Sequence, residues 1–468
     1  MSTSSLPPAD GLMRASAVDL LRLLRAGEVG AVELLELVLR RADAVEGTVN
    51  PFALRLDEPA RRAAEESDRR LADGTARPLE GLPFTAKDSQ WLAGVPTTSG
   101  SLAPPVVPSG TVGGLRRVLD AGGVLFAKTT TSEFCYSAVS TAPRFGVTAN
   151  PHDLARTAGG SSGGAAAQIA AHVGPVALGG DGGGSIRIPA AFCGVVGHKP
   201  TFGAVSHEPS GSGWKTLVAI GPMTRTVADA ALLLDVLAGA DPADRHGVDL
   251  AADDAGRPLR IAVSEDLGFA AVDDDVRTAF RAAVAALADS GVELVHVDPE
   301  VGSSSQDWAV IATAEARWSN TAPHDLLSPA VQNYLAFGGA VSAEAYVRAQ
   351  FRREEIHSRY LDFFDRSGTD VLFTPTVGCV AFDAAFPFPA SIGGVPVLEP
   401  WREWAPFVCD ANLAGLPACT VPLGPGDAGL PVGGQILGPR RRDRRVLRAA
   451  ALLEHALSPS CLTEGALP

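Results

Sequence analysis

The sequence has few features that would indicate nucleic-acid, membrane or disulfide chemistry. Lysine and arginine number 39 against 53 aspartates and glutamates, and the formal charge of −14 argues against a broad surface for nucleic acid or anionic lipid. Its six cysteines form no CxxC pair, which favours a reduced, cytoplasmic protein over a disulfide scaffold. Cys135 and Cys193 are expected to be small buried residues rather than nucleophiles. No signal peptide is predicted, because the first residues lack a basic segment followed by an apolar run.

One long stretch, residues 157–180, lacks Asp, Glu, Lys and Arg altogether. It is long enough to cross a bilayer. However, it contains Ser161, Ser162, Gln168 and His172 together with several glycines. We therefore predict that it is a buried element of a globular protein.

The remaining pattern indicates a large α/β protein. Hydrophobic residues make up 46% of the 468 positions, which is enough for a large core. Apolar residues recur at helical spacing over residues 16–45, with a break at 28–30, which predicts two helices. Short apolar runs at 81–87, 124–127 and 175–178 alternate with helical stretches, as in α/β architecture.

No linker clearly divides the chain. We predict a helical N-terminal part, residues 1–75, continuous with an α/β domain at residues 76–468. Residues 300–410 have the least regular pattern and include an aromatic-rich stretch, 382–407. No internal repeat is found.

The densest signal is AGGSSGGAAAQIAAHVGPVALGGDGGGSIR, residues 158–187. Two glycine-rich loops, 159–164 and 179–185, flank a helix of small residues and a short strand. In open α/β sheets, the loop that leaves the carboxyl end of a strand binds ligands. Successive N–H groups without side chains can converge on an oxyanion, so a serine after such a run is a candidate nucleophile.

Other motifs fit this segment less well. A phosphate-binding loop requires GxxxxGK[ST], and a dinucleotide fingerprint requires a strand–helix context that is absent here. The α/β-hydrolase elbow GxSxG lacks its second glycine after Ser185. The nearby histidines have no ligand partner at i+3 or i+4, so structural roles are expected for His152, His172, His198 and His207.

Several separate segments resemble the amidase signature family, and together they span nearly the whole chain. The segments are GGSSGG (159–164), DGGGSIR (181–187), FTAKD (84–88), HKPTFGAVS (198–206), IGPMTRTVADAALLLDVLAG (220–239), DVLFTPT (370–376) and NLAGLPACTVPLG with GLPVGGQILGP (412–439). The separations between Lys87, Ser161 and Ser185 are also typical of the family.

The resemblance implies a fold and a catalytic triad. The fold is a single large domain with a twisted mixed β-sheet covered by helices on both faces. Ser185 matches the acylated nucleophile, and Lys87 matches the base. Ser161 matches the bridging serine, which follows a cis peptide bond in relatives; here that bond joins Gly160 to Ser161.

The resemblance also assigns the residues around the nucleophile. The N–H groups of Gly182, Gly183, Gly184 and Ser185 match the oxyanion hole. Asp181 and Arg187 match a pair that supports the loop without making or breaking bonds.

Lys87 can act as a base only when it is neutral. A free lysine has a pKa of about 10.4 and is protonated at pH 7. Burial lowers the pKa of an amine by disfavouring its charge, and the apolar residues 82–84 beside it could provide that burial. Without the serine motifs, a surface pair with Asp88 would be the ordinary interpretation of Lys87.

The chain departs from the family at two places. Gly180 and Gly182 flank Asp181 where many relatives have threonine or serine, and the lost hydroxyls are expected to leave room in the floor of the pocket. TLVAIGP, at 216–222, lacks an acidic residue that many relatives carry. Both departures concern substrate identity more than the triad.

The sequence thus predicts an amidase that hydrolyses a linear, non-peptide amide through an acyl-enzyme. No metal and no organic cofactor are implied; a small-molecule amide is the expected partner, and a homodimer is left open. The alternatives are the glutaminase subunit of a tRNA-dependent amidotransferase, an acyltransferase and a non-catalytic binding protein. Trp401 and Trp404 are predicted to line an acyl pocket for aryl or bulky apolar groups, with core filling as the alternative.

Overall fold

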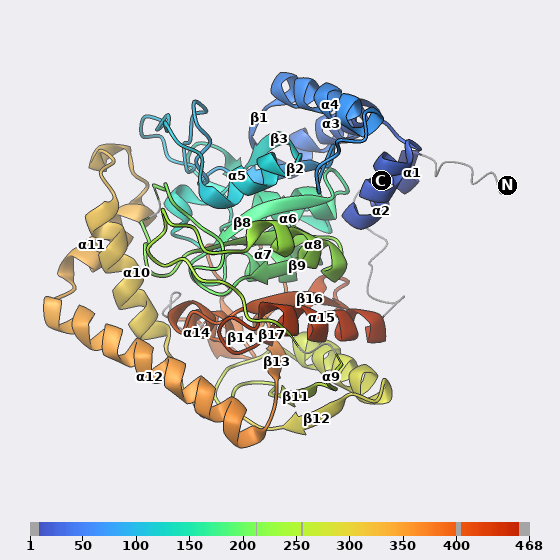
Figure 1. The fold of residues 1–468 in the computed structure, drawn as a ribbon. Coiled ribbons are helices and arrows are strands. Elements are labelled where there is room, and N and C mark those ends of the chain that lie inside the picture. The colour runs from blue at the N-terminus through green and yellow to red at the C-terminus, as the bar shows by residue number, and fades with distance from the viewer. Residues whose placement is uncertain (1–8, 212, 254–255, 399–403, 458–468) are drawn as a thin grey trace.

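The computed structural model describes residues 9–211, 213–253, 256–398 and 404–457. Within them, the centre of the fold is an 11-stranded sheet in the order β1-β3-β2-β8-β10-β9-β16-β17-β13-β11-β12 (Figure 1). Its strands are β1 (Phe52–Arg55), β2 (Pro83–Lys87), β3 (Val124–Thr129), β8 (Val176–Asp181), β9 (Val196–Lys199), β10 (Ala219–Thr224), β11 (Arg260–Val263), β12 (Glu293–His296), β13 (Val371–Pro375), β16 (Ala418–Pro425) and β17 (Pro431–Leu437).

Smaller elements complete the fold. Three short ribbons pair β4 (Thr141–Ala142) with β5 (Gly146–Val147), β6 (Ala149–Asn150) with β7 (Asp153–Thr157), and β14 (Ser391–Ile392) with β15 (Val395–Pro396). The helices are α1 (Ala9–Arg14), α2 (Ala17–Ala26), α3 (Ala31–Val49), α4 (Asp57–Ala72), α5 (Gly113–Asp120), η1 (Glu133–Cys135), α6 (Gly163–Ala170), α7 (Arg187–Cys193), α8 (Val227–Leu237), α9 (Asp274–Asp289), α10 (Ser305–Ser319), η2 (His324–Leu326), α11 (Pro329–Ala340), α12 (Ala343–Ser367), α14 (Pro406–Leu413) and α15 (Asp443–Leu457).

The sheet is mixed, and its parallel strands position the glycine-rich loops. β2 runs parallel to both β3 and β8, whereas β10 is antiparallel to β8. Because β2 and β8 are parallel neighbours, Lys87 and Asp181, the last residues of the two strands, lie at the same edge of the sheet. The predicted mixed α/β sheet is therefore confirmed. Residues 157–180 form β8, α6 and their connections, and no helix within the described residues is long and apolar enough to span a bilayer.

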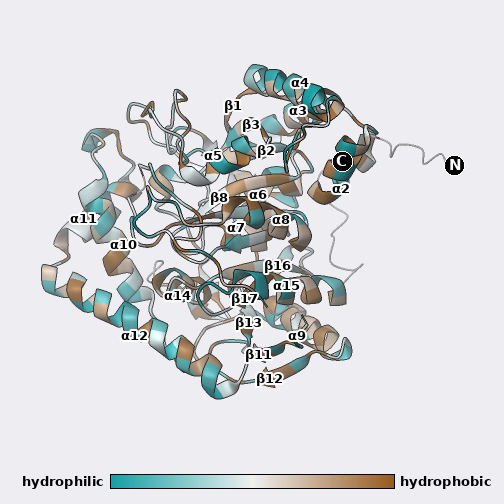
Figure 2. Ribbon diagram, viewed as in Figure 1, coloured by the Kyte–Doolittle hydropathy of each residue, from teal (hydrophilic) through white to brown (hydrophobic). Residues whose placement is uncertain are grey.

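The N-terminal helices pack on the rest of the molecule through leucines. In α2, Ser16 accepts a hydrogen bond from the Asp19 N–H at the start, and Gly27 ends the helix with φ of 66°. This glycine explains the break predicted near residue 28. Figure 2 shows apolar colour along the central strands and hydrophilic colour over much of α4.

Residues 300–410 are more regular than the sequence predicts. They hold α10, α11 and α12, which lie together at one side of the molecule (Figure 1). α12 has 25 residues, of which only Ala349, Ile356, Tyr360, Phe363 and Phe364 are buried. Because its apolar residues form only a narrow stripe among many charged residues, the helical spacing of α12 is hard to recognise in the sequence. This explains why the region was predicted to be the least regular.

Candidate active site

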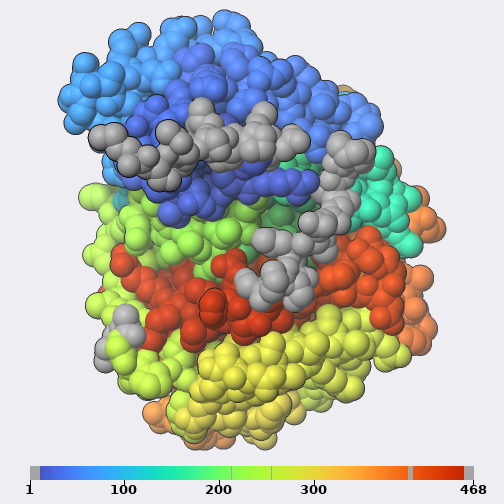
Figure 3. Space-filling model, turned by 90° about the vertical axis from the view of Figure 1, so that its right-hand side faces the viewer, coloured from blue at the N-terminus to red at the C-terminus, as the bar shows by residue number. Residues whose placement is uncertain are grey.

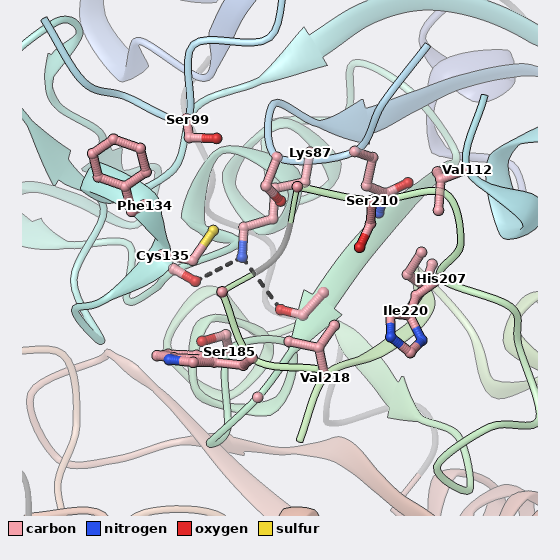
Figure 4. A pocket seen from close by; sticks show the side chains of 18 of the residues that line it. Lys87, Ser99, Val112, Phe134, Cys135, Ser185, His207, Ser210, Val218 and Ile220 are labelled. Carbon is pink, nitrogen blue, oxygen red and sulfur yellow. Dashed lines mark hydrogen bonds between the residues drawn. The ribbon is translucent and has the colours of Figure 1, made fainter. Parts of the chain in front are cut away.

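Lys87 ends a strand whose five residues are all buried. Its side chain is 1% exposed, and its Nζ lies 2.6 Å from Ser161 Oγ and 3.2 Å from the carbonyl oxygen of Gly180 (Figure 4). The alternative pair with Asp88 is not formed. Asp88 instead forms a buried ion pair of 2.9 Å with Lys128. The amine of Lys87 is therefore directed at a serine hydroxyl and not at a carboxylate.

Burial lowers the pKa of Lys87 below its ordinary value. The neighbouring Cys135 and, more weakly, the carboxylate of Asp181 act in the opposite direction without cancelling this effect. Less free energy is thus needed to deprotonate this amine than to deprotonate a free lysine, as the base of the predicted triad requires.

The two glycine-rich loops are tied together at the serines. The peptide bond between Gly160 and Ser161 is cis, as the resemblance implies. The N–H of Ser162 donates to the carbonyl of Ser185 at 3.1 Å, and its Oγ lies 3.3 Å from both the N and the O of Gly180. These contacts fix the loop before α6 against the loop after β8.

Ser185 follows a run of three glycines between β8 and α7 and is 6% exposed. No hydrogen-bond acceptor within the described residues engages the N–H groups of Gly182, Gly183 and Ser185. The N–H of Gly184, in contrast, donates to Asp181 Oδ1 at 2.7 Å. Among the N–H groups predicted for the oxyanion hole, that of Gly184 therefore differs, because it already has an acceptor that holds the loop.

Asp181 and Arg187 form a fully buried ion pair. Arg187 Nε and Nη2 each lie 3.0 Å from the Asp181 carboxylate, and its other contacts are Gln435 Oε1, Asn412 Oδ1 and the Val408 carbonyl. Burial alone would raise the pKa of Asp181, but the guanidinium outweighs it and holds that pKa well below its ordinary value. Asn412 and Gln435 were not predicted as site residues, although both lie in segments that carry the family resemblance.

The three predicted catalytic residues line one pocket. In Figure 4, Phe134 and Cys135 lie on one side of Lys87, and Val218, Ile220 and His207 lie on the other. The described lining includes no aspartate, glutamate or arginine. Its apolar part comprises Trp91, Val112, Phe134, Tyr136, Trp214, Val218 and Ile220.

Comparison with known proteins places this geometry in a family. The amidase family model matches residues 33–447. The chain belongs to the amidase signature family. It is therefore an enzyme of a family whose members hydrolyse amides.

The relatives of this amidase differ in what they act on. It is 36% identical over 456 residues to a glutamyl-tRNA(Gln) amidotransferase subunit of Chloroflexus aggregans, covering 89% of this chain and 91% of that one. It is 34% identical over 464 residues to an acylamidase of Rhodococcus erythropolis, covering 94% of each. A bacterial aryl acylamidase structure matches with a TM-score of 0.87 and 26% identity, over 95% of this chain and 96% of that one.

Of the two tryptophans predicted to line the acyl pocket, Trp404 lies within the described residues and does not line it. Trp401 lies outside the described residues. Trp404 is 4% exposed and packs against Phe192 and Phe382, with ring centroids 6.3 and 5.7 Å away. Its cluster is separate from the pocket lining. Trp404 therefore fills the core, which was the alternative interpretation.

The missing side chains at Gly180 and Gly182 were both expected to leave room in the floor of the pocket. A Cβ atom on Gly180 would meet nothing within 4 Å, as expected, but the space beside Gly182 is not open. The indole of Trp214 occupies that space, and a second indole, that of Trp308, covers Gly183. Trp308 Nε1 also donates to the Gly182 carbonyl at 2.7 Å. Neither tryptophan was predicted as a site residue, because nothing in the sequence shows which side chain packs over a glycine.

Two residues with predicted structural roles lie at the pocket. Cys135 lines it beside Lys87, and His207 lines it with its ring 2% exposed. Burial lowers the pKa of His207, and the carboxylates of Asp244 and Glu208 act in the opposite direction without cancelling this effect. His152, His172 and His198 are not part of the lining, in agreement with structural roles.

Proposed function

We propose that this amidase hydrolyses a small carboxylic amide through an acyl-enzyme on Ser185. The observation that carries the proposal is the buried contact of 2.6 Å between Lys87 Nζ and Ser161 Oγ in the pocket that Ser185 lines. A buried lysine that faces a serine hydroxyl and forms no ion pair with any described residue fits a base in a proton relay. It does not fit a structural ion pair.

The reaction proceeds in two halves. Ser185 Oγ attacks the amide carbonyl carbon while its proton passes to Ser161 Oγ and the proton of Ser161 passes to neutral Lys87. The oxyanion of the tetrahedral intermediate accepts hydrogen bonds from the N–H groups of Gly182, Gly183 and Ser185. The relay then returns the proton to the nitrogen as the C–N bond breaks, and the amine leaves. Water attacks the ester in the same manner and regenerates Ser185.

The pocket favours uncharged, apolar substrates. Its lining is rich in aromatic and aliphatic side chains, and the described lining has no carboxylate and no guanidinium. A charged group on the substrate would lose its hydration there without gaining a partner of opposite charge. Amides with aryl or bulky apolar groups are therefore the proposed substrates.

The identity to an amidotransferase subunit supports a second candidate, glutamine hydrolysis for a partner protein. Glutamine carries an ammonium and a carboxylate, which require oppositely charged partners when buried. Ammonia release from glutamine, together with a co-purifying partner, would favour this second function. Turnover of neutral amides without glutaminase activity is the expected result.

The test is covalent labelling combined with a substrate screen. A fluorophosphonate probe is expected to label Ser185, as read by peptide mass spectrometry, and Ser185→Ala is expected to abolish both labelling and turnover of an amide library. Ser290→Ala, a serine change at the end of the distant helix α9, serves as the matched control and is expected to retain both. Labelling at Cys135, or full turnover by Ser185→Ala, would contradict the serine mechanism.

A further inference from the structure

Trp214 occupies a position that is available only because residue 182 is glycine. It lies in the segment between β9 and β10, is 5% exposed and lines the pocket. A Cβ atom on Gly182 would lie 2.7 Å from Cζ3 of the indole and nearer still to Cε3. Both separations are shorter than carbon atoms tolerate, so any other residue at 182 requires the ring or the loop to move.

The indole has little room to move aside. The ring of Trp308 meets it edge-on with centroids 5.9 Å apart, and the ring of Tyr136 lies 5.5 Å away. Tyr136 is itself stacked on Tyr334 at 4.9 Å. These four rings come from four separate segments, and three of them are among the buried core residues. A side chain at 182 would therefore displace the loop that carries the free N–H groups.

We propose that Trp214 determines the specificity of this amidase and that Gly182 and Trp214 act as a size-matched pair. The proposal rests on the function proposed above. The indole forms a flat apolar wall directly beside the N–H groups offered to the scissile carbonyl. An aryl group bonded to that carbonyl packs on the wall, whereas a methyl group leaves the wall uncovered.

The experiment compares four proteins: the wild type, Gly182→Ala, Trp214→Ala and the double variant. Each is assayed for kcat/KM on two anilides that share the amine and differ only in a benzoyl or an acetyl group. The wild type is expected to prefer the benzoyl anilide, and Trp214→Ala is expected to lower the benzoyl-to-acetyl ratio by about 10- to 200-fold.

Gly182→Ala tests the size match. It is expected to lower kcat/KM on both anilides by at least about 100-fold, because the loop that presents the N–H groups is displaced. The double variant is expected to recover at least about tenfold on the acetyl anilide over Gly182→Ala, since the space left by the indole accepts the methyl group. Changes at two residues in contact are non-additive in this manner, whereas independent changes multiply.

A second readout does not depend on turnover. Gly182→Ala is expected to lower the thermal unfolding midpoint, and Trp214→Ala in the same chain is expected to restore part of that loss. Trp214→Leu repeats the cycle with a bulkier side chain in case the alanine variant does not fold. Trp404→Phe, which alters an indole outside the pocket, is the matched control and is expected to leave the benzoyl-to-acetyl ratio unchanged.

The outcomes separate this inference from the proposed function. Fluorophosphonate labelling of Ser185 with an unchanged benzoyl-to-acetyl ratio in Trp214→Ala would overturn the specificity role and leave the hydrolase intact. Multiplicative effects in kcat/KM together with additive shifts of the unfolding midpoint would overturn the size match. Absence of labelling in the wild type would overturn the hydrolase, and the thermal cycle would still test the size match.

Discussion

The acid–base chemistry of Lys87 is altered by its surroundings. Its amine is buried against a serine hydroxyl and a carbonyl oxygen, and Asp88, the nearest acidic residue in sequence, is bound to Lys128. A protonated amine in this place would be poorly solvated and without a direct carboxylate partner. The surroundings therefore favour the form that can accept a proton.

This environment leads to a pH prediction. Because only the neutral amine accepts the proton of Ser161, kcat/KM for a neutral amide is expected to rise with pH through the lowered pKa of Lys87 and then level off. Lys87→Ala is expected to remove this limb and most of the rate. The measurement is kcat/KM from pH 5 to pH 10 at constant ionic strength.

His207 provides the control for that profile, because it also lines the pocket and its pKa is also lowered. The limb is expected to persist in His207→Gln, since the proposed relay passes from Ser185 through Ser161 to Lys87 and does not include this ring. Loss of the limb in His207→Gln, or an unchanged profile in a still active Lys87→Ala enzyme, would contradict the assignment of Lys87 as base.

The sequence was most informative about individual residues that recur in fixed motifs. Lys87, Ser161 and Ser185 were all predicted, and the structure brings them to one pocket. The hydrogen bond from the Gly184 N–H to Asp181 was not predicted, because a sequence does not show which N–H group a carboxylate accepts from. Trp214 was missed for a similar reason, since its role depends on a glycine far away in the chain.

At the scale of elements, the site depends on how the loop after β8 is held. Asp181 ends the strand and Arg187 begins α7, so their ion pair closes the loop that carries Ser185. Asn412 on α14 and Gln435 on β17 complete the contacts of Arg187. Elements from both halves of the chain therefore meet beneath the nucleophile.

Removal of Arg187 is expected to destabilise the protein strongly. Arg187→Ala would leave the Asp181 carboxylate buried without its cation, at a cost of about 3–5 kcal/mol in the free energy of unfolding. The measurement is urea-induced unfolding at pH 7. The stabilisation from Asp181 is present above its unfolded pKa of about 3.9 and is lost as the pH falls towards the lower folded value.

Arg348 offers a matched control for this change. It pairs with Glu344 on the exposed surface of α12, where both side chains are more than 70% exposed. Arg348→Ala is expected to change the free energy of unfolding by less than about 0.5 kcal/mol. Equal effects of the two arginine variants would contradict the bracing role of Arg187.

The elements themselves were predicted unevenly. Short buried strands and the N-terminal helices have clear periods in the sequence, and the structure confirms them. α10, α11 and α12 were not predicted, for different reasons. α12 buries only five of its 25 residues. α10 buries eight of its 15 residues, but most of these are alanine, serine or threonine, which give a weak hydrophobic period. The aromatic side chains of Trp308 and Tyr334, from this region, do not line the pocket themselves. They pack against Trp214, which does.

The whole molecule is organised around one large sheet, and the helices that cover it contact one another in a continuous series. In the view of Figure 3, the N-terminal helices lie next to α8, α8 lies next to α15, and α15 lies next to α9. α2 is joined to α8 by the hydrogen bond from the Val18 N–H to Asp229, and β1 forms the edge of the same sheet as the catalytic strands. We therefore propose that residues 1–75 and 76–468 unfold together.

Deletion of residues 1–75 tests this proposal. The deletion removes β1 from the sheet and uncovers the apolar surface on which Leu20, Leu24 and Leu35 are buried. Because such burial provides most of the stability of packed helices, the remaining chain is expected to show no cooperative thermal transition. The matched control is a protease site inserted into the exposed residues 73–76, where cleavage after folding is expected to leave the two parts associated and active. Calorimetry on both proteins decides the question, and a cooperative transition of unchanged midpoint in the deleted chain would show that residues 1–75 are a separate domain.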